Sequence, residues 1–257
     1  MSHPAVTIER RARTGIVRVD RKGRANALSF DIMDALTEAA RGFEGDTETA
    51  AVILTGTAEI FSAGMDLRDP AFARLDAMSL AELRALAEHG PRMARAWAGI
   101  EVPTIAAVEG PCLGGGLALA AMCDFRVAGR SARFGAPEVA VGVNMGWHSV
   151  PRLTGLVGAQ ATRRLLMLGE EWSGEDASRL GFVDRLVEAE SALDAALEMA
   201  AALAARPAMA TRMVKRQIDA AAHGLDFMAS AYDKDQHALT FLSEDFRETL
   251  KRFGKPS

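Results

Sequence analysis

Two short, unbroken apolar runs constrain the fold of this chain more than any other feature. They are Ala51–Thr55 (AVILT), which ends at Gly56, and Thr104–Val108 (TIAAV), which follows Pro103. Strands without polar alternation are buried on both faces, as in parallel sheets covered by helices. Because parallel strands need long crossover connections, usually helical, we expect an α/β protein with layered sheets.

The segments around these runs alternate between strand and helix patterns. Short apolar or alternating segments predict further strands, the first two as a β-hairpin, at residues 5–10, 16–20, 125–128, 132–134 and 183–187. Apolar positions at helical spacing predict helices after Ser29, over residues 80–100 and over residues 113–122. Residues 1–190 are therefore expected to form one α/β core.

From Ser191 onward the strand pattern disappears. Helices are predicted over residues 191–205, 208–222 and 226–253, with breaks at Pro207 and Gly224. We therefore expect residues 191–257 to form a separate helical module. Its alanine-rich faces suit close helix contacts, either with the core or with another subunit.

The composition limits the partners that the chain could have. Its 257 residues carry 30 lysines and arginines against 34 aspartates and glutamates, a net charge of −4. Nucleic-acid-binding proteins usually show a basic excess, so nucleic acid is not an expected partner. The apolar stretches are far shorter than the roughly 20 residues that span a bilayer, and the first residues hold no signal-like segment. Cys112 and Cys123 make no zinc pattern and are expected as core residues. We expect a cytoplasmic protein with no metal and no membrane partner.

Three segments that follow predicted strands do not have the pattern of an ordinary strand, helix or turn. They are residues 61–67 (FSAGMDL), 109–117 (EGPCLGGGL) and 134–139 (FGAPEV). In α/β proteins, ligand sites form outside the carboxyl ends of strands. These segments are therefore the candidate site.

The triple glycine Gly114–Gly116 begins a predicted helix. Glycine lets a ligand approach the backbone closely, and a helix N-terminus favours a negative oxygen. The segment matches neither the dinucleotide pattern, because the spacing from Gly110 is wrong, nor a P-loop, because no Lys-Ser/Thr follows. Alone, it suits a tight helix–strand crossing as well as an anion site.

A second loop and a carboxylate favour the anion site. The segment Ala63-Gly64-Met65 also puts a glycine next to an exposed peptide N–H, and two loops that each offer one amide form an oxyanion hole if the fold brings them together. Glu138 follows Pro137 and is followed by the apolar residues Val139, Ala140, Val141 and Val143. In an apolar pocket its pKa would rise, and it would serve as a general base or acid; the alternative is a solvated surface glutamate.

The order of these motifs resembles the enoyl-CoA hydratase/isomerase (crotonase) family. The matching segments cover nearly the whole chain: 24–28, 61–67, 104–110 with 114–116, 123–126, 134–139, 151–153 with Gly158, and 243–248. The resemblance implies a crotonase-like spiral of ββα turns with a C-terminal helical trimerisation module, assembled as a homotrimer or as a hexamer of two trimers. It also implies an acyl-CoA thioester substrate and no separate cofactor, since coenzyme A is part of the substrate.

The resemblance also assigns site residues. The family holds an enolate on the thioester oxygen with two backbone N–H groups, which match Met65 and Gly115, and Glu138 matches its catalytic carboxylate. Residues placed along the CoA and acyl path are Ala25, Ala27, Ala63, Gly64, Asp66, Leu67, Gly114, Trp147, Phe253 and Lys255. The basic residues Arg21, Lys22 and Arg24 are either phosphate partners or solvated surface charge.

One departure from the family pattern affects the expected reaction. Hydratases of this family carry a second glutamate three residues after the middle glycine, where this chain has Ala118. A site with one glutamate resembles the isomerases that convert 3-enoyl-CoA to 2-enoyl-CoA. The aspartate of the dienoyl-CoA isomerases is also missing, because its position is Gly146.

Two other functions remain open. They are hydration of 2-enoyl-CoA in fatty-acid or related acyl-CoA catabolism, and acyl-CoA binding without catalysis. Trp147 is expected as a pocket wall or core anchor. His148 is expected at the surface or behind the site, and a role for it or for His89 as a substitute catalytic group is the less favoured alternative.

Overall fold

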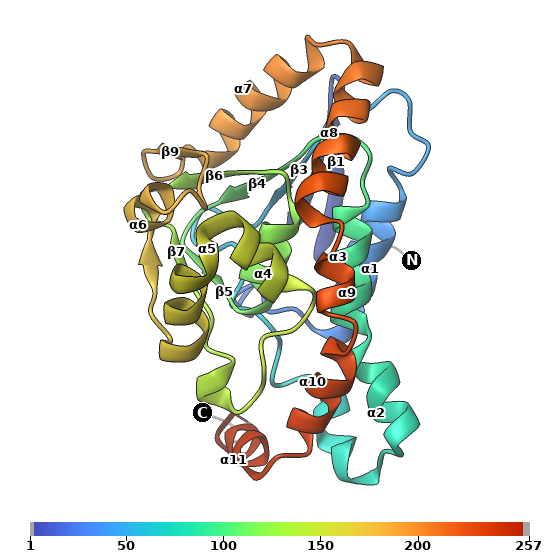
Figure 1. Ribbon diagram of the computed structural model, residues 1–257, viewed down its shortest axis with the longest axis vertical. Coiled ribbons are helices and arrows are strands. Elements are labelled where there is room, and N and C mark those ends of the chain that lie inside the picture. Colours follow the sequence, from blue (N-terminus) through green and yellow to red (C-terminus); the bar gives the residue numbers. More distant parts are fainter. Residues whose placement is uncertain (1–2, 254–257) are drawn as a thin grey trace.

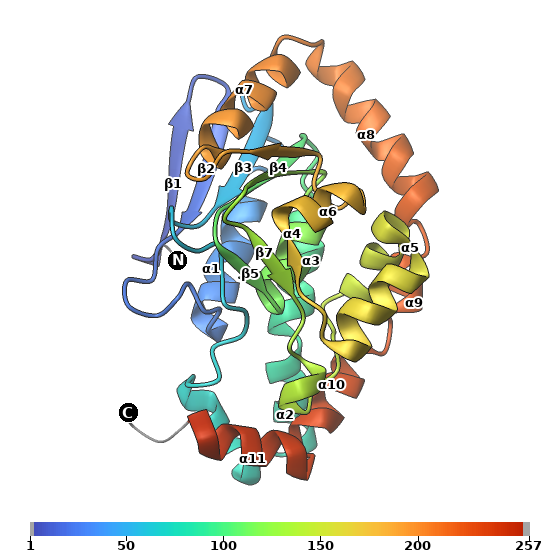
Figure 2. The same ribbon diagram turned by 90° about the vertical axis from the view of Figure 1, so that its left-hand side faces the viewer.

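A computed structural model describes residues 3–253, and within them the strands form two sheets (Figures 1 and 2). The larger sheet has six strands, in the order β1 (Val6–Arg11), β2 (Thr14–Val19), β3 (Ala51–Thr55), β4 (Thr104–Val108), β6 (Phe125–Gly129) and β9 (Arg185–Val187). β1 and β2 form the predicted antiparallel hairpin, and every later pairing in this sheet is parallel.

The two apolar runs are the central strands, as predicted. In β3, Val52 and Leu54 belong to the main core, whereas Ile53 lies on the opposite face of the sheet. That opposite face is covered by α7 (Ala192–Ala204), whose alanines Ala196 and Ala200 are fully buried against it. The alanine-rich face of this helix therefore packs on the core (Figure 2).

The smaller sheet contains β5 (Pro111–Leu113), β7 (Arg133–Gly135) and β8 (Trp172–Ser173), of which β5 and β8 had not been predicted. The chain passes from the larger sheet to the smaller one twice in succession, from β4 to β5 and then from β6 to β7. Each of these two turns of the chain therefore adds one strand to each sheet. A single bridge between Ser62 and Cys112 extends the smaller sheet toward the 61–67 loop. This winding brings the candidate loops side by side.

Helices fill the remaining layers. In the first half these are α1 (Phe30–Arg41), the 3-10 segment η1 (Pro70–Ala77), α2 (Leu80–Ala87), α3 (His89–Ala98) and α4 (Gly115–Met122). Later come η2 (Val139–Val141), α5 (Ser149–Leu168), α6 (Gly174–Arg179), α8 (Ala208–His223), α9 (Asp226–Ala229), α10 (Asp233–Phe241) and α11 (Glu244–Phe253). No helix within residues 3–253 is long and apolar enough to cross a membrane.

Two predicted long helices are wrong, since each is divided. The helix expected over residues 80–100 breaks at Glu88, because Pro91 has no N–H to donate to the carbonyl one turn earlier. The helix expected over residues 226–253 is three helices, and Ser243 begins the last of them by accepting a hydrogen bond from the Phe246 amide.

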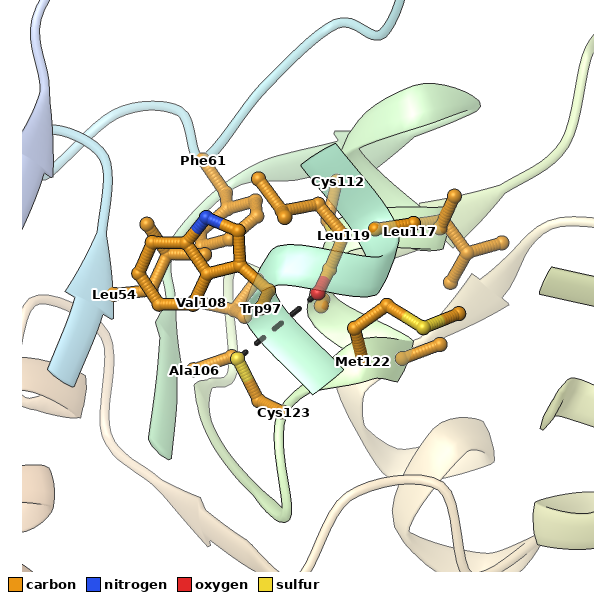
Figure 3. Close-up of a cluster of buried hydrophobic side chains, with 14 of the residues drawn as sticks. Leu54, Phe61, Trp97, Ala106, Val108, Cys112, Leu117, Leu119, Met122 and Cys123 are labelled. Carbon is orange, nitrogen blue, oxygen red and sulfur yellow. Dashed lines mark hydrogen bonds between the residues drawn. The ribbon is translucent and has the colours of Figure 1, made fainter. Parts of the chain in front are cut away.

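Both cysteines are core residues, as predicted. Figure 3 shows them in one apolar cluster with Trp97, Leu117 and Leu119, and the Cys123 thiol donates to the Leu119 carbonyl. Burial raises the pKa of the Cys123 thiol to about 12, and that of the Cys112 thiol is raised as well. Neither thiol is ionised near neutral pH.

Candidate active site

A cavity of about 390 Å³ lies where the three candidate loops meet. Its lining includes exposed residues, among them Arg24 and Phe253, and buried ones, among them Met145, Trp147 and His237. We call these two parts of the lining the exposed end and the buried end. Nearly all residues proposed from the sequence line it: Ala25, Ala27, Ala63, Gly64, Met65, Asp66, Leu67, Gly114, Gly115, Glu138, Trp147 and Phe253. The remaining one, Lys255, lies outside the described residues.

Backbone bonds fix the 61–67 loop against its neighbours. The Ala63 amide donates to the Ala25 carbonyl over 3.0 Å, and a bridge joins Leu28 to Met65. Asn26, in the left-handed region at φ +48°, donates its side-chain amide to the Ile60 carbonyl. The conformation of residues 25–28 thus sets the position of the loop.

The two amides expected to form an oxyanion hole lie in adjoining loops. A Cβ on Gly64 would come within 3.2 Å of the Gly115 nitrogen, so these backbones are in contact. Neither the Met65 amide nor the Gly115 amide donates to any group within residues 3–253. Unpartnered N–H groups at a helix start and in a neighbouring loop suit a negative oxygen. Their catalytic role stays a prediction.

Each of the three consecutive glycines makes room for a different group. A Cβ on Gly114 would approach the Glu138 carboxylate oxygen Oε1 to 2.6 Å. On Gly115 it would meet the Trp147 ring at 2.3 Å, and on Gly116 it would meet the Ser62 side chain at 2.7 Å. The triple glycine therefore packs closely against three side chains, as a tight crossing requires. Its role as an anion site stays a prediction.

Glu138 lies between β7 and η2, with its carboxylate beside Gly114. Its Oε2 atom is buried and has no hydrogen-bond partner among the described residues. Burial raises the pKa of Glu138 to about 7, because the charged form loses its solvation. Of the apolar residues that follow Glu138 in the sequence and were expected to surround it, Val141 and Val143 line the cavity, whereas Val139 and Ala140 are exposed. These neighbours therefore explain the burial of Glu138 only in part.

Trp147 forms a wall of the cavity and is also a buried anchor. Its ring fits against two glycines, since a Cβ on Gly90 of α3 would lie 2.0 Å from its Nε1 atom and a Cβ on Gly115 would lie 2.3 Å from its ring carbon Cζ3. Trp147 and His148 have φ values of +60° and +59°, a backbone conformation that residues other than glycine rarely adopt. Such strain persists only where surrounding contacts fix it.

The two histidines considered from the sequence do not line the cavity. His148 is buried, so a surface position is wrong; its Nδ1 lies 2.5 Å from Ser230 Oγ and its Nε2 lies 3.0 Å from an Arg95 nitrogen. Burial and the Arg95 charge lower the pKa of His148 to about 4. His89 Nδ1 lies 2.8 Å from Asp34 Oδ1. Both therefore have partners away from the site.

The basic residues near the exposed end separate into two kinds. Arg21 does not line the cavity, and it donates over 2.8 Å to Asp66, a buried carboxylate of the lining. Its role as a phosphate partner stays a prediction. Arg24 lines the cavity and is half exposed, whereas Lys22 is exposed and does not line it. Arg68 also lines the cavity, and the sequence reasoning missed it because its motif ends at Leu67.

His237 is a further lining residue that the sequence did not reveal. It comes from α10, far along the chain from the three loops, and its Nε2 atom is buried without a partner in the described chain. Burial lowers the pKa of His237 to about 4. No local motif marks it, since only the fold brings α10 to the cavity.

Among residues 3–253, no cluster of His, Cys, Asp and Glu suited to a metal ion occurs.

Comparison with known proteins agrees with this architecture. A family model described as enoyl-CoA hydratase/isomerase matches residues 9–255. The probable enoyl-CoA hydratase echA8 of Mycobacterium tuberculosis is 32% identical over 256 residues, which cover 98% of this chain and 96% of that protein. The short-chain-enoyl-CoA hydratase of Clostridium acetobutylicum is 30% identical over 249 residues, covering 96% and 94%.

Solved structures have the same fold. OdaA of Pseudomonas aeruginosa superposes with a TM-score of 0.87 at 27% identity, covering 99% of this chain and 100% of that one. An enoyl-CoA hydratase/isomerase of Xanthobacter autotrophicus superposes with a TM-score of 0.88 at 26% identity, covering 98% and 95%. The crotonase fold expected from the motifs is thus confirmed. The chain belongs to the enoyl-CoA hydratase/isomerase family and is an acyl-CoA enzyme of that family.

Proposed function

We propose that this enzyme moves a double bond within an acyl-CoA thioester, converting 3-enoyl-CoA to 2-enoyl-CoA. The observation that carries the proposal is the single unpartnered carboxylate of the cavity, Glu138. Asp66 also lines the cavity, but it is paired with Arg21. Ala118, at the position of the second glutamate in the hydratases, faces the same cavity with an apolar side chain.

In the proposed reaction, the Glu138 carboxylate removes a proton from C2 of the acyl group. The electron pair of that bond moves into the conjugated system, and the negative charge collects on the thioester oxygen. The Met65 and Gly115 amides donate to this oxygen and stabilise the dienolate. Glu138, now protonated, returns the proton to C4, which leaves the double bond between C2 and C3.

The pKa of Glu138 suits a group that both takes and returns a proton. At a pKa of about 7, the carboxylate and the carboxylic acid are both accessible near neutral pH. A base at its ordinary pKa near 4.5 would be ionised but would be a weaker acceptor of the C2 proton. The raised value therefore favours transfer in both directions through one residue.

Hydration of 2-enoyl-CoA is the second candidate, because the curated relatives at 30–32% identity are named as hydratases. It would require Glu138 alone, or another group, to orient water and deliver the proton. The acyl-CoA site is proposed to take coenzyme A at the exposed end of the cavity, where Arg24 and Arg68 supply positive charge for its phosphates.

Parallel assays of a 3-enoyl-CoA and a 2-enoyl-CoA separate the two reactions. We expect isomerisation to exceed hydration, and Glu138→Gln to lower it at least 100-fold while CoA-ester binding persists. Fast hydration by the wild type, or full isomerase activity in Glu138→Gln, would overturn the proposal. As a matched test of the missing carboxylate, Ala118→Glu should raise hydration without abolishing binding.

A further inference from the structure

Two buried polar side-chain atoms of the cavity lining have no hydrogen-bond partner within the described residues. They are Glu138 Oε2 and His237 Nε2. A buried polar group without a partner is costly, and its retention calls for a ligand or another role. Glu138 has such a role in the proposed reaction. His237 has none yet.

His237 lies at the buried end of the cavity, with only 4% of its surface exposed. Its ring packs edge-on against Phe241, with ring centroids 4.6 Å apart. Together with Met65 and Trp147 it also borders a second space, which is too narrow for a water molecule and lined mainly by apolar side chains. Its Nε2 is thus an unpartnered polar atom among mainly apolar side chains.

The hydrogen bonds of the ring define what Nε2 offers. His237 Nδ1 lies 3.1 Å from the Asn144 side-chain oxygen, which also accepts from Thr240 Oγ1 over 3.3 Å. Nδ1 therefore carries the ring proton, and Nε2 presents a lone pair. Because burial holds the pKa of His237 near 4, the ring is neutral at pH 7. The atom accepts a hydrogen bond but supplies no charge.

We propose that His237 selects acyl groups that carry a hydroxyl beyond the reacting carbons, by accepting that hydroxyl's hydrogen bond at Nε2. A purely hydrocarbon chain would cover Nε2 without satisfying it, and a carboxylate would face a lone pair. Sites built to bind a hydroxyl discriminate strongly against analogues that lack it. The inference rests on the proposed function only in that the acyl group occupies this cavity.

Binding of saturated acyl-CoA esters to the whole protein, measured by calorimetry, tests the proposal without any turnover. The probes are unsubstituted esters of increasing length, their terminal hydroxy and terminal carboxy derivatives, and their 3-hydroxy derivatives. At one length or more, we expect the terminal hydroxyl to tighten binding about 10- to 100-fold over the unsubstituted ester. The carboxylate should give no gain. Because no probe has a double bond, the result does not depend on the isomerase assignment.

Three variants complete the test. His237→Leu should abolish the preference while binding the unsubstituted ester at least as well as the wild type. His237→Gln, whose side-chain amide reaches the place of Nε2, should retain part of it. Thr240→Val removes the hydroxyl that contacts Asn144 and the His237 carbonyl but leaves the imidazole present, and it should keep the preference. Thermal unfolding shows that each variant folds.

The proposal is overturned if the wild type has no preference at any length, or if His237→Leu keeps it. It is also overturned if Thr240→Val loses the preference as fully as His237→Leu does, because the effect would then be structural. A gain confined to the 3-hydroxy esters would contradict it too, since that hydroxyl lies at a reacting carbon and corresponds to added water. Tighter binding of the terminal carboxy esters than of the unsubstituted esters would also contradict the proposal.

Discussion

The Glu138 oxygen Oε1 occupies the space into which a side chain on Gly114 would project, at 2.6 Å from its Cβ position. Gly114 has φ +51° and ψ −118°, a conformation that only glycine adopts readily. The candidate base and the start of α4 are therefore built as one unit. A change at either residue should alter the other.

Gly114→Ala should lower isomerase activity about 100-fold or more, because the methyl group would displace the carboxylate and the neighbouring Gly115 amide. The backbone strain should also destabilise the fold by about 1–3 kcal/mol. Steady-state kinetics and thermal unfolding measure the two effects. Gly181→Ala is the matched control, since Gly181 has φ +81° with no atom near its Cβ position. It should lose stability but keep activity; an equal loss of activity would show that strain alone is responsible.

The pH dependence of kcat/KM should report the ionisation of Glu138. Because the carboxylate is the proposed base and its pKa is about 7, kcat/KM should fall as the pH drops through 7. His148 and His237 do not contribute there, because their pKa values lie near 4. Measuring kcat/KM over a series of pH values checks this, because that ratio reports the ionisation of the free enzyme. An acid limb near the ordinary glutamate value of 4.5 would contradict the burial of this carboxylate.

The same raised pKa should make Glu138 a source of instability at high pH. Between about 4.5 and 7 the folded chain keeps a proton that the unfolded chain releases, so the free energy of unfolding falls as pH rises through this window. Glu138→Gln removes the penalty. The variant should be more stable than the wild type by about 1–3 kcal/mol at pH 8, with little difference near pH 4.5. Denaturant unfolding at both pH values checks this, and a variant equally stable or less stable at pH 8 would refute it.

The sequence located those parts of the site whose signal is local. The strands β3 and β4 follow directly from their unbroken apolar runs, which the structure buries on both faces. The two loops that would supply an oxyanion hole were indicated by their glycines, and the resemblance to the family assigned the amides to Met65 and Gly115. These features need no knowledge of distant residues.

The parts that the sequence missed depend on tertiary contacts. Gly90 looks like an ordinary helix interruption until Trp147 is seen against it. His237 lies on a helix whose pattern is unremarkable, and its burial at the cavity arises only when α10 packs near Met145 and Trp147. A periodic pattern predicts the face that a helix buries but not the site that it completes.

Trp147 should control the length of the acyl group, because its large ring lines both the main cavity and the narrow second space. Trp147→Phe joins the two spaces, so KM should fall for long-chain esters relative to short-chain ones. Kinetics over a series of chain lengths measures this shift. Trp172→Phe is the matched control, a buried tryptophan outside the cavity lining. Both variants should lose about 1–3 kcal/mol of stability, but only the first should change chain-length preference. An equal change of chain-length preference in both variants would contradict this role of Trp147.

The helix α8 should lie in a contact between subunits. None of its residues is buried in the described chain, and it is tied to the core by long polar side chains, such as Lys215 donating to Asp124 over 2.6 Å. Met213 and Ile218 of the same helix are more than half exposed. A 16-residue helix with no fully buried residue is marginal by itself, so a partner surface is expected to cover these side chains. Light scattering should give three or six times the 27.4 kDa chain mass. Met213→Glu and Ile218→Glu should reduce that multiple, whereas Leu80→Glu, an equally exposed position on α2, should not. A wild type that remains at the mass of one chain at micromolar concentration would rule out the assembly.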